Sequence, residues 1–158
     1  MLSHLPQALA FIMALIFSAN SFANANDTAP SRAEQDVKHM YAIRIVFGEH
    51  IVSATLEDNP STRDFIAQLP LSLDLDDYSS TEKIAYLPRK LTTTGAPPGV
   101  DPDVGDIAYY APWGNLALFY QDFGYSDGLI RLGRITAGLE HLSFPGSKHA
   151  KIELVPTD

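Results

Sequence analysis

The stretch GDIAYYAPWGNLALFY, residues 105–120, predicts two short strands joined by a tight turn. Aliphatic and aromatic residues fill both halves, as is typical of strands, and Pro112 and Gly114 between them are common turn residues. Alternation in the first half places Ile107 and Tyr109 on one face of a sheet and the residues between them on the other. The middle of the chain is therefore expected to form a β-hairpin.

Trp113 is the only tryptophan in the chain, and it lies in the turn of this hairpin. Turns lie at the surface, where a large amphipathic ring is either exposed or covers a cavity. Pro112, Gly114 and Asn115 are expected to set the direction of the indole. The proline keeps the preceding residue extended, the glycine lets the chain reverse, and the asparagine can close the turn with its side chain. We expect Trp113 at or beside the rim of the principal pocket, accompanied by Tyr86, Arg89 and Tyr110. The alternative is an indole that only plugs one end of the structure.

One helix is predicted, over about residues 60–69. Asn59 is a good N-cap, Pro60 suits the first helical position, and Pro70 ends the helix. Four residues share one face of this helix at i, i+3, i+4 and i+7 spacing: Thr62, Phe65, Ile66 and Leu69. This apolar face is expected to pack against β-structure.

Short strand-like runs separated by turn residues account for most of the remaining chain. They occupy residues 41–48, 50–57, 71–75, 83–88, 90–95, 129–135 and 149–155. Many short strands with a single helix are typical of a closed sheet. The sequence therefore predicts a mainly β protein, a small closed β-barrel with one α-helix.

The N-terminus has the features of an export signal. Residues 8–19, ALAFIMALIFSA, are uninterruptedly apolar, but a bilayer-spanning helix needs about 20 residues. Alanines at positions 23 and 25 fit the site that a signal peptidase reads. We predict a signal peptide over 1–25, a flexible lead-in over 26–40 and a domain over 41–158, in a periplasmic or secreted protein. Cleavage after Ala23 and an uncleaved membrane anchor are the alternatives.

The charge of the chain disfavours two classes of partner. Its formal net charge is −8, and every charged residue lies beyond position 25. Nucleic acids and anionic membranes would repel such a domain, so neither is expected as a partner. The chain has no cysteine, which excludes disulfides and thiol chemistry.

The polar residues do not form a recognisable metal or catalytic motif. Two acidic clusters, residues 74–77 and 101–106, lack the ligand spacing of a calcium-binding loop. The five histidines are scattered without zinc-ligand spacing, and no G-x-S-x-G motif is present. We expect no metal and no cofactor, and no catalytic residue is assigned.

Several stretches resemble the bacterial cyclophilin-like fold family. They are TLEDNPSTRDFIAQLPLSLDLDDYSSTEKI (55–84), YLPRKL (86–91), the hairpin and GLIRLGRI (128–135), and the likeness extends over Ala42 to Leu142. The resemblance implies a small closed barrel with a helix capping one end. Some relatives occur beside flavodoxin-type domains or are fused to them, which implies a possible redox neighbour. The F-H-R-V and S-Q-F-F motifs of true cyclophilins, which are prolyl isomerases, do not occur in this sequence.

These observations favour a binding module with an aromatic-lined barrel mouth, which would hold a small molecule or an extended peptide. The candidate ligand-binding residues are Tyr86, Arg89, Tyr110, Trp113, Phe119 and Arg131. The alternative is a prolyl isomerase with a non-standard site, in which Arg89 or Arg131 would polarise the amide. A structural or assembly role without a ligand is the third possibility.

Overall fold

The structure is a computed structural model that describes residues 39–156. The predicted signal peptide and almost all of the predicted lead-in lie outside these residues. The strands are β1 (Met40–Phe47), β2 (His50–Glu57), β3 (Leu71–Tyr78), β4 (Glu82–Tyr86), β5 (Gly99–Val100), β6 (Asp106–Tyr110), β7 (Asn115–Phe119), β8 (Ser126–Asp127), β9 (Leu129–Ala137) and β10 (Ser147–Leu154). The helices are α1 (Pro60–Ile66) and a 3₁₀ helix, η2 (Leu139–Leu142).

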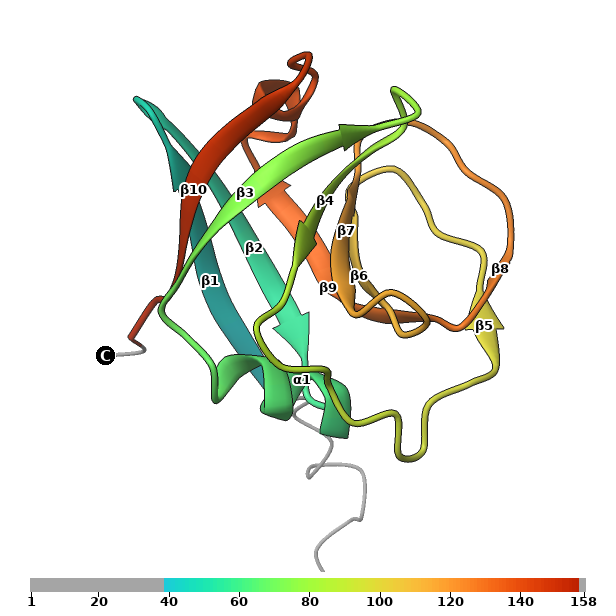
Figure 1. Ribbon diagram of the computed structural model, residues 1–158. Coiled ribbons are helices and arrows are strands. Elements are labelled where there is room, and N and C mark those ends of the chain that lie inside the picture. The colour runs from blue at the N-terminus through green and yellow to red at the C-terminus, as the bar shows by residue number, and fades with distance from the viewer. Residues whose placement is uncertain (1–38, 157–158) are drawn as a thin grey trace, which may run out of the picture. The chain divides into compact units, whose positions relative to one another are not determined.

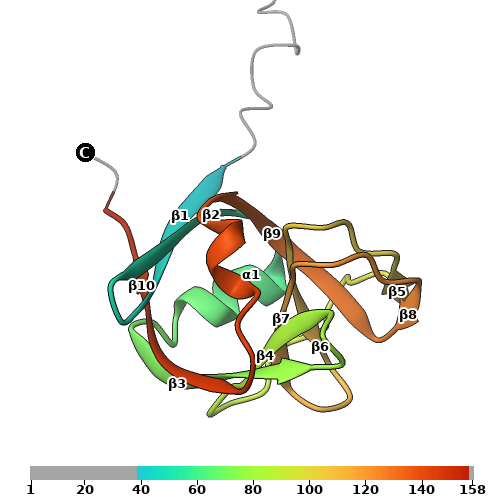
Figure 2. The ribbon, with the colours of Figure 1, turned by 90° about the horizontal axis from the view of Figure 1, so that it is seen from above.

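Eight strands form a closed antiparallel barrel in the order β1-β10-β3-β4-β7-β6-β9-β2 (Figure 1). This confirms the prediction of a closed, mainly β barrel. The remaining two strands, β5 and β8, pair with each other outside the barrel wall (Figure 2). Of the helices in residues 39–156, none is both long and apolar enough to cross a membrane.

The barrel interior is filled by alternate residues of each strand. In β6, Ile107 and Tyr109 lie on one face, as the alternation predicted, and this face points inward and is almost fully buried. The Tyr109 hydroxyl accepts a hydrogen bond from the backbone N–H of Leu91 at 3.1 Å. Residues 90–95, expected as strand-like, are instead irregular, and this bond holds their first part against the barrel.

The helix α1 lies at one end of the barrel and η2 at the other (Figure 1). The Asn59 side chain caps α1 by accepting a hydrogen bond from the N–H of Thr62 at 2.8 Å, as predicted. Phe65 is fully buried against the core. The helix ends at Ile66, earlier than expected, because residues 68 and 69 bond three residues back in a tighter turn.

The opening hairpin forms as predicted, with β6 and β7 joined by residues 111–114. The Gly114 N–H donates to the carbonyl of Tyr110 at 2.8 Å and closes the turn. Gly114 has φ +76°, a left-handed conformation that residues with a side chain adopt at a cost. The turn therefore depends on glycine at this position, next to the tryptophan.

Candidate functional site

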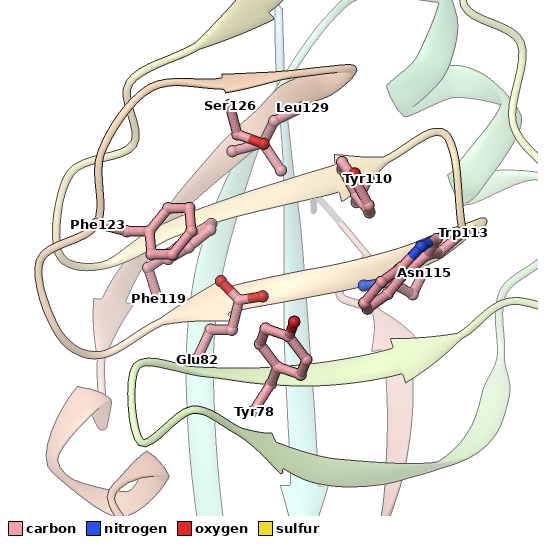
Figure 3. A pocket seen from close by; sticks show the side chains of 9 residues that line it. All are labelled: Tyr78, Glu82, Tyr110, Trp113, Asn115, Phe119, Phe123, Ser126 and Leu129. Atoms are coloured by element: carbon pink, nitrogen blue, oxygen red, sulfur yellow. The ribbon is translucent and has the colours of Figure 1, made fainter.

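An aromatic pocket lies on the outer face of the barrel wall (Figure 3). Its cavity has a volume of about 130 Å³. The lining residues come from β3, β4, β6, β7, β8, β9 and the connections after β6 and β7: Tyr78, Glu82, Tyr110, Trp113, Asn115, Phe119, Phe123, Ser126 and Leu129. We call this cavity the outer-wall pocket.

Strand register sets the two sides of the outer-wall pocket. At one side, Glu82 of β4 pairs with Tyr78 of β3 and with Phe119 of β7, so these three side chains lie in a row. At the other side, Tyr110 of β6 pairs with Asn115 of β7 and with Leu129 of β9. The positions between the two rows on β6 and β7 carry alanine, whose methyl groups rise little above the sheet. Small residues between two rows of large ones leave a hollow.

Aromatic rings make up most of the pocket wall. The Trp113 ring packs edge-on against Tyr78, with centroids 5.7 Å apart, and against Tyr110, with centroids 5.4 Å apart. Phe123, from the connection between β7 and β8, packs on Phe119 at 5.7 Å. Trp113 remains 47% exposed, so it lies between the pocket and solvent.

Glu82 is the only lining residue with a carboxyl group. It is 9% exposed, and within residues 39–156 its carboxyl group has no hydrogen-bond or ion-pair partner. Burial raises its pKa to about 7, because the charged form loses contact with water. Figure 3 shows its carboxyl group directed into the space between the rings. The pocket therefore contains an acidic group that titrates near neutral pH.

Asn115 adds an unsatisfied acceptor to the same wall. It is 1% exposed, and its Nδ2 donates to the carbonyl of Leu116 at 2.9 Å. Its Oδ1 has no hydrogen-bond partner among the described residues. Buried polar atoms are usually paired, so an unpaired acceptor that lines a cavity is available to a ligand or to water.

Comparisons with known proteins place this barrel in a family. A sequence model of the Cyclophilin-like family matches residues 45–153, more than half of the chain. The chain belongs to the Cyclophilin-like family. This confirms the resemblance that the sequence stretches carried, and it identifies the barrel as a Cyclophilin-like domain.

One solved structure shares the fold of this Cyclophilin-like domain. It is the solution structure of the hypothetical protein AF2241 from Archaeoglobus fulgidus, with a TM-score of 0.56 and 18% sequence identity. The match covers 77% of this chain and 99% of the archaeal protein. At this identity the likeness concerns the fold alone. No curated protein sequence matches the chain.

Three of the six predicted ligand-binding residues meet in the outer-wall pocket of the Cyclophilin-like domain: Tyr110, Trp113 and Phe119. Tyr86 pairs with Asn115 in register but is 54% exposed and does not line the pocket. Of the three residues expected beside Trp113, Tyr110 lines the same pocket, whereas Tyr86 and Arg89 do not.

The two predicted arginines are held elsewhere. Arg89 forms an ion pair with Asp64 of α1 at 2.7 Å, because the segment after β4 folds back toward the helix. Arg131 pairs with Asp106 at 2.7 Å and lines a second cavity, of about 280 Å³, beside α1. Asp106 belongs to one of the acidic clusters, so that cluster is partly neutralised by arginine. Among residues 39–156, no group of three acidic or histidine side chains is arranged to hold a metal ion.

The location of the pocket differs from the expected barrel mouth. Inward residues of β6 and β7, such as Tyr109 and Leu116, belong to the main core, whereas Phe119 and Leu129 belong to a separate buried cluster on the outer face. The connection through β8 covers this cluster from outside, and Gly128 of that connection bonds to the carbonyl of Pro98 at 2.7 Å. This outer cluster therefore lies between the barrel wall and the connection from β7 to β9, residues 120–128, which we call the flap.

Sequence reasoning missed six lining residues: Tyr78, Glu82, Asn115, Phe123, Ser126 and Leu129. Glu82 was not predicted because its neighbours in the pocket are set by strand pairing, and the sequence does not tell which strands pair with β4. A signal did exist within β4, where Glu82, Ile84 and Tyr86 alternate with Lys83 and Ala85. It could have placed Glu82 on the same face as Tyr86, but not beside Phe119.

Proposed function

We propose that the Cyclophilin-like domain binds a small molecule in the outer-wall pocket. The observation that carries this proposal is the combination of five aromatic rings with two buried oxygen acceptors, on Glu82 and Asn115, that lack side-chain partners among residues 39–156. Ligand sites are typically apolar cavities with a few oriented polar groups. An extended peptide could present one side chain to the same cavity.

Prolyl isomerisation receives less support than binding. The reaction, as it is known in true cyclophilins, uses an arginine beside an apolar pocket for the proline ring. Neither an arginine nor a lysine lines the outer-wall pocket, and Arg89 and Arg131 are each paired with an aspartate outside it. A protease-coupled assay with proline peptides tests this alternative, and measurable isomerisation would favour it.

Binding can be tested through the single tryptophan. A library of small fragments is titrated into the purified protein while Trp113 fluorescence and backbone amide NMR shifts are recorded. We expect ligands whose shifts cluster at residues 78, 82, 110, 115 and 129. Ligands whose shifts cluster only around Arg131 would move the site to the second cavity. A screen without any ligand would favour a structural or assembly role.

We also propose that the protein acts outside the cytoplasm. The apolar run at residues 8–19 and the alanines at 23 and 25 support this. A functional redox neighbour of flavodoxin type remains a prediction from the family resemblance. The net charge of −8 supports a partner other than nucleic acid or an anionic membrane.

A further inference from the structure

In the described part of the chain, no cationic side chain lines the outer-wall pocket to balance its carboxyl group. Four other carboxyl groups with restricted access to water each face a cation: Asp64 with Arg89, Asp77 with Lys83, Asp106 with Arg131, and Glu153 with Arg44 and Lys151. Glu82 is more buried than most of these, yet no lining residue carries a positive charge. A buried carboxylate without a counter-ion is costly, so a cationic ligand would stabilise it.

The rings around Glu82 favour the same sign of charge. Trp113 stands nearly perpendicular to Tyr78 and to Tyr110, with interplanar angles of 82° and 78°. Three rings in this arrangement form a box, and the faces of aromatic rings attract cations, with tryptophan the strongest. Figure 3 shows Tyr78 next to Glu82, with Trp113 and Tyr110 on the far side of the space that the carboxyl group faces.

Other ligand classes fit the pocket less well. An anion would be repelled by ionised Glu82. A neutral apolar molecule would cover the carboxyl group without pairing it. A hard metal ion needs about six oxygen ligands, whereas the pocket offers one carboxyl group, the Asn115 amide oxygen and the hydroxyls of its tyrosines and Ser126. An alkylammonium group can make cation–π contacts with the rings and also pair with the carboxylate.

We propose that the outer-wall pocket binds a small organic cation, an alkylammonium group, with Glu82 as its counter-ion and the rings of Tyr78, Tyr110 and Trp113 as its walls. This inference rests on the proposed binding function and names its ligand class. An ammonium that retains N–H groups can also donate to Asn115 Oδ1, the buried acceptor without a partner. The cavity of about 130 Å³ suits a compact head group, with any longer substituent extending past the half-exposed Trp113.

The test compares a cation with a neutral molecule of the same shape. Choline and its uncharged carbon isostere, 3,3-dimethyl-1-butanol, are titrated into the purified protein by calorimetry at pH 8, where Glu82 is ionised. We expect choline to bind at least tenfold more tightly than the isostere. Glu82→Gln should weaken choline binding at least tenfold, while Glu49→Gln, which removes an equal charge from the exposed β1–β2 turn, should leave it unchanged.

A second pair of variants tests the rings independently of Glu82. Trp113→Phe keeps an aromatic face in the box, whereas Trp113→Leu keeps only apolar bulk. We expect the leucine variant to bind choline about tenfold more weakly than the phenylalanine variant. Circular dichroism of each variant checks that the barrel is folded.

The outcomes separate this inference from the proposed function. Equal binding of choline and the isostere, or choline binding that survives Glu82→Gln, would overturn the organic cation and leave a small-molecule site in place. The same holds if choline, tetramethylammonium and methylammonium all fail while the fragment screen finds ligands in the pocket. Failure of every cation and every fragment would overturn both.

Discussion

Glu82 and Lys83 are neighbours in the sequence, yet they lie in opposite environments because successive residues of β4 face opposite sides of the barrel wall. Lys83 points inward and is fully buried, where it pairs with Asp77 at 2.6 Å and lies 3.9 Å from the centre of the Phe144 ring. Tyr120 also donates to Asp77, at 2.5 Å. The charge of Lys83 inside the barrel is therefore paired with Asp77, whereas the carboxyl group of Glu82 on the outer face is directed into the pocket.

The pKa of Glu82 predicts how stability depends on pH. Burial raises this pKa from 4.5 in the unfolded chain to about 7 in the folded protein. The folded state therefore holds this proton more tightly, and the free energy of unfolding falls as the pH rises from about 4.5 to 7. The Glu82→Gln variant has no group that ionises at this position, so its free energy of unfolding should exceed that of the wild type above pH 7. We expect a difference of about 2 kcal/mol, which is less than the full pKa shift implies because water that reaches the pocket screens the charge.

Urea unfolding of both proteins at pH 4, 6 and 8 measures this difference. The two curves should converge at pH 4. The carboxyl groups of Asp64, Asp77 and Glu153 have lowered pKa values and act in the opposite direction, but only at more acidic pH. Equal stability of the two proteins at pH 8 would show that Glu82 is well solvated.

Trp113 is expected to behave as a residue at the rim of a pocket. With 47% of its surface exposed, its fluorescence should be quenched readily by acrylamide, and a bound ligand should reduce that quenching. Trp113→Ala removes ring contacts with Tyr78 and Tyr110 but little buried area, so it should cost about 1 kcal/mol or less. A loss of several kcal/mol would assign the indole a structural role.

Between elements, β9 passes close to β2 at Gly133. A Cβ atom at this position would lie 2.1 Å from the carbonyl oxygen of Thr55 and 2.6 Å from the Cα of Leu56. Both are backbone atoms of a paired strand, so they cannot move aside without disturbing the sheet. Glycine at this position is required by close packing.

We therefore expect Gly133→Ala to destabilise the barrel by about 3 kcal/mol, the upper part of the range for overpacking. Gly124→Ala is the matched control, because its Cβ would meet no atom within 4 Å and should change stability by less than about 0.5 kcal/mol. Thermal unfolding of both variants measures the contrast. Equal stability of the two would mean that β2 and β9 can separate locally.

At the scale of the whole molecule, the outer-wall pocket depends on the strand order of the barrel and on the flap outside it. The pocket joins residues from position 78 to position 129, and β3, β4, β7, β6 and β9, which are neighbours in that order, bring them to the same part of the wall. The flap is attached by the β5–β8 pair and by the bond from the Ala111 N–H to the carbonyl of Gly128, at 3.0 Å. The barrel supplies the fixed wall, and the flap supplies Phe123 and Ser126.

The export proposal also concerns the whole chain. Mass spectrometry of the protein from its native host should show a mature N-terminus at Asn26, or at Asn24 if cleavage follows Ala23. A full-length chain retained in the membrane fraction would contradict cleavage and favour the membrane anchor.

The sequence by itself determined the local elements of this protein. The β6–β7 hairpin, the capped helix and the shared face of Ile107 and Tyr109 follow from turn residues, an N-cap and alternation, all of which act over a few positions. The pattern of many short strands and one helix was also enough to predict the closed barrel, because a closed sheet leaves no strand with an unpaired edge.

Only the tertiary structure decided which side chains share a site. Alternation separates two faces of a strand, but it does not tell which face becomes the core, so the aromatic residues expected at a barrel mouth lie on the outer wall. Likewise, Arg89 and Arg131 are charged in any fold, but their aspartate partners were set by the path of the chain around α1 and β6. Glu82 came to lie among aromatic rings through strand register alone, since its neighbours across the sheet are Tyr78 and Phe119, one near in sequence and one remote.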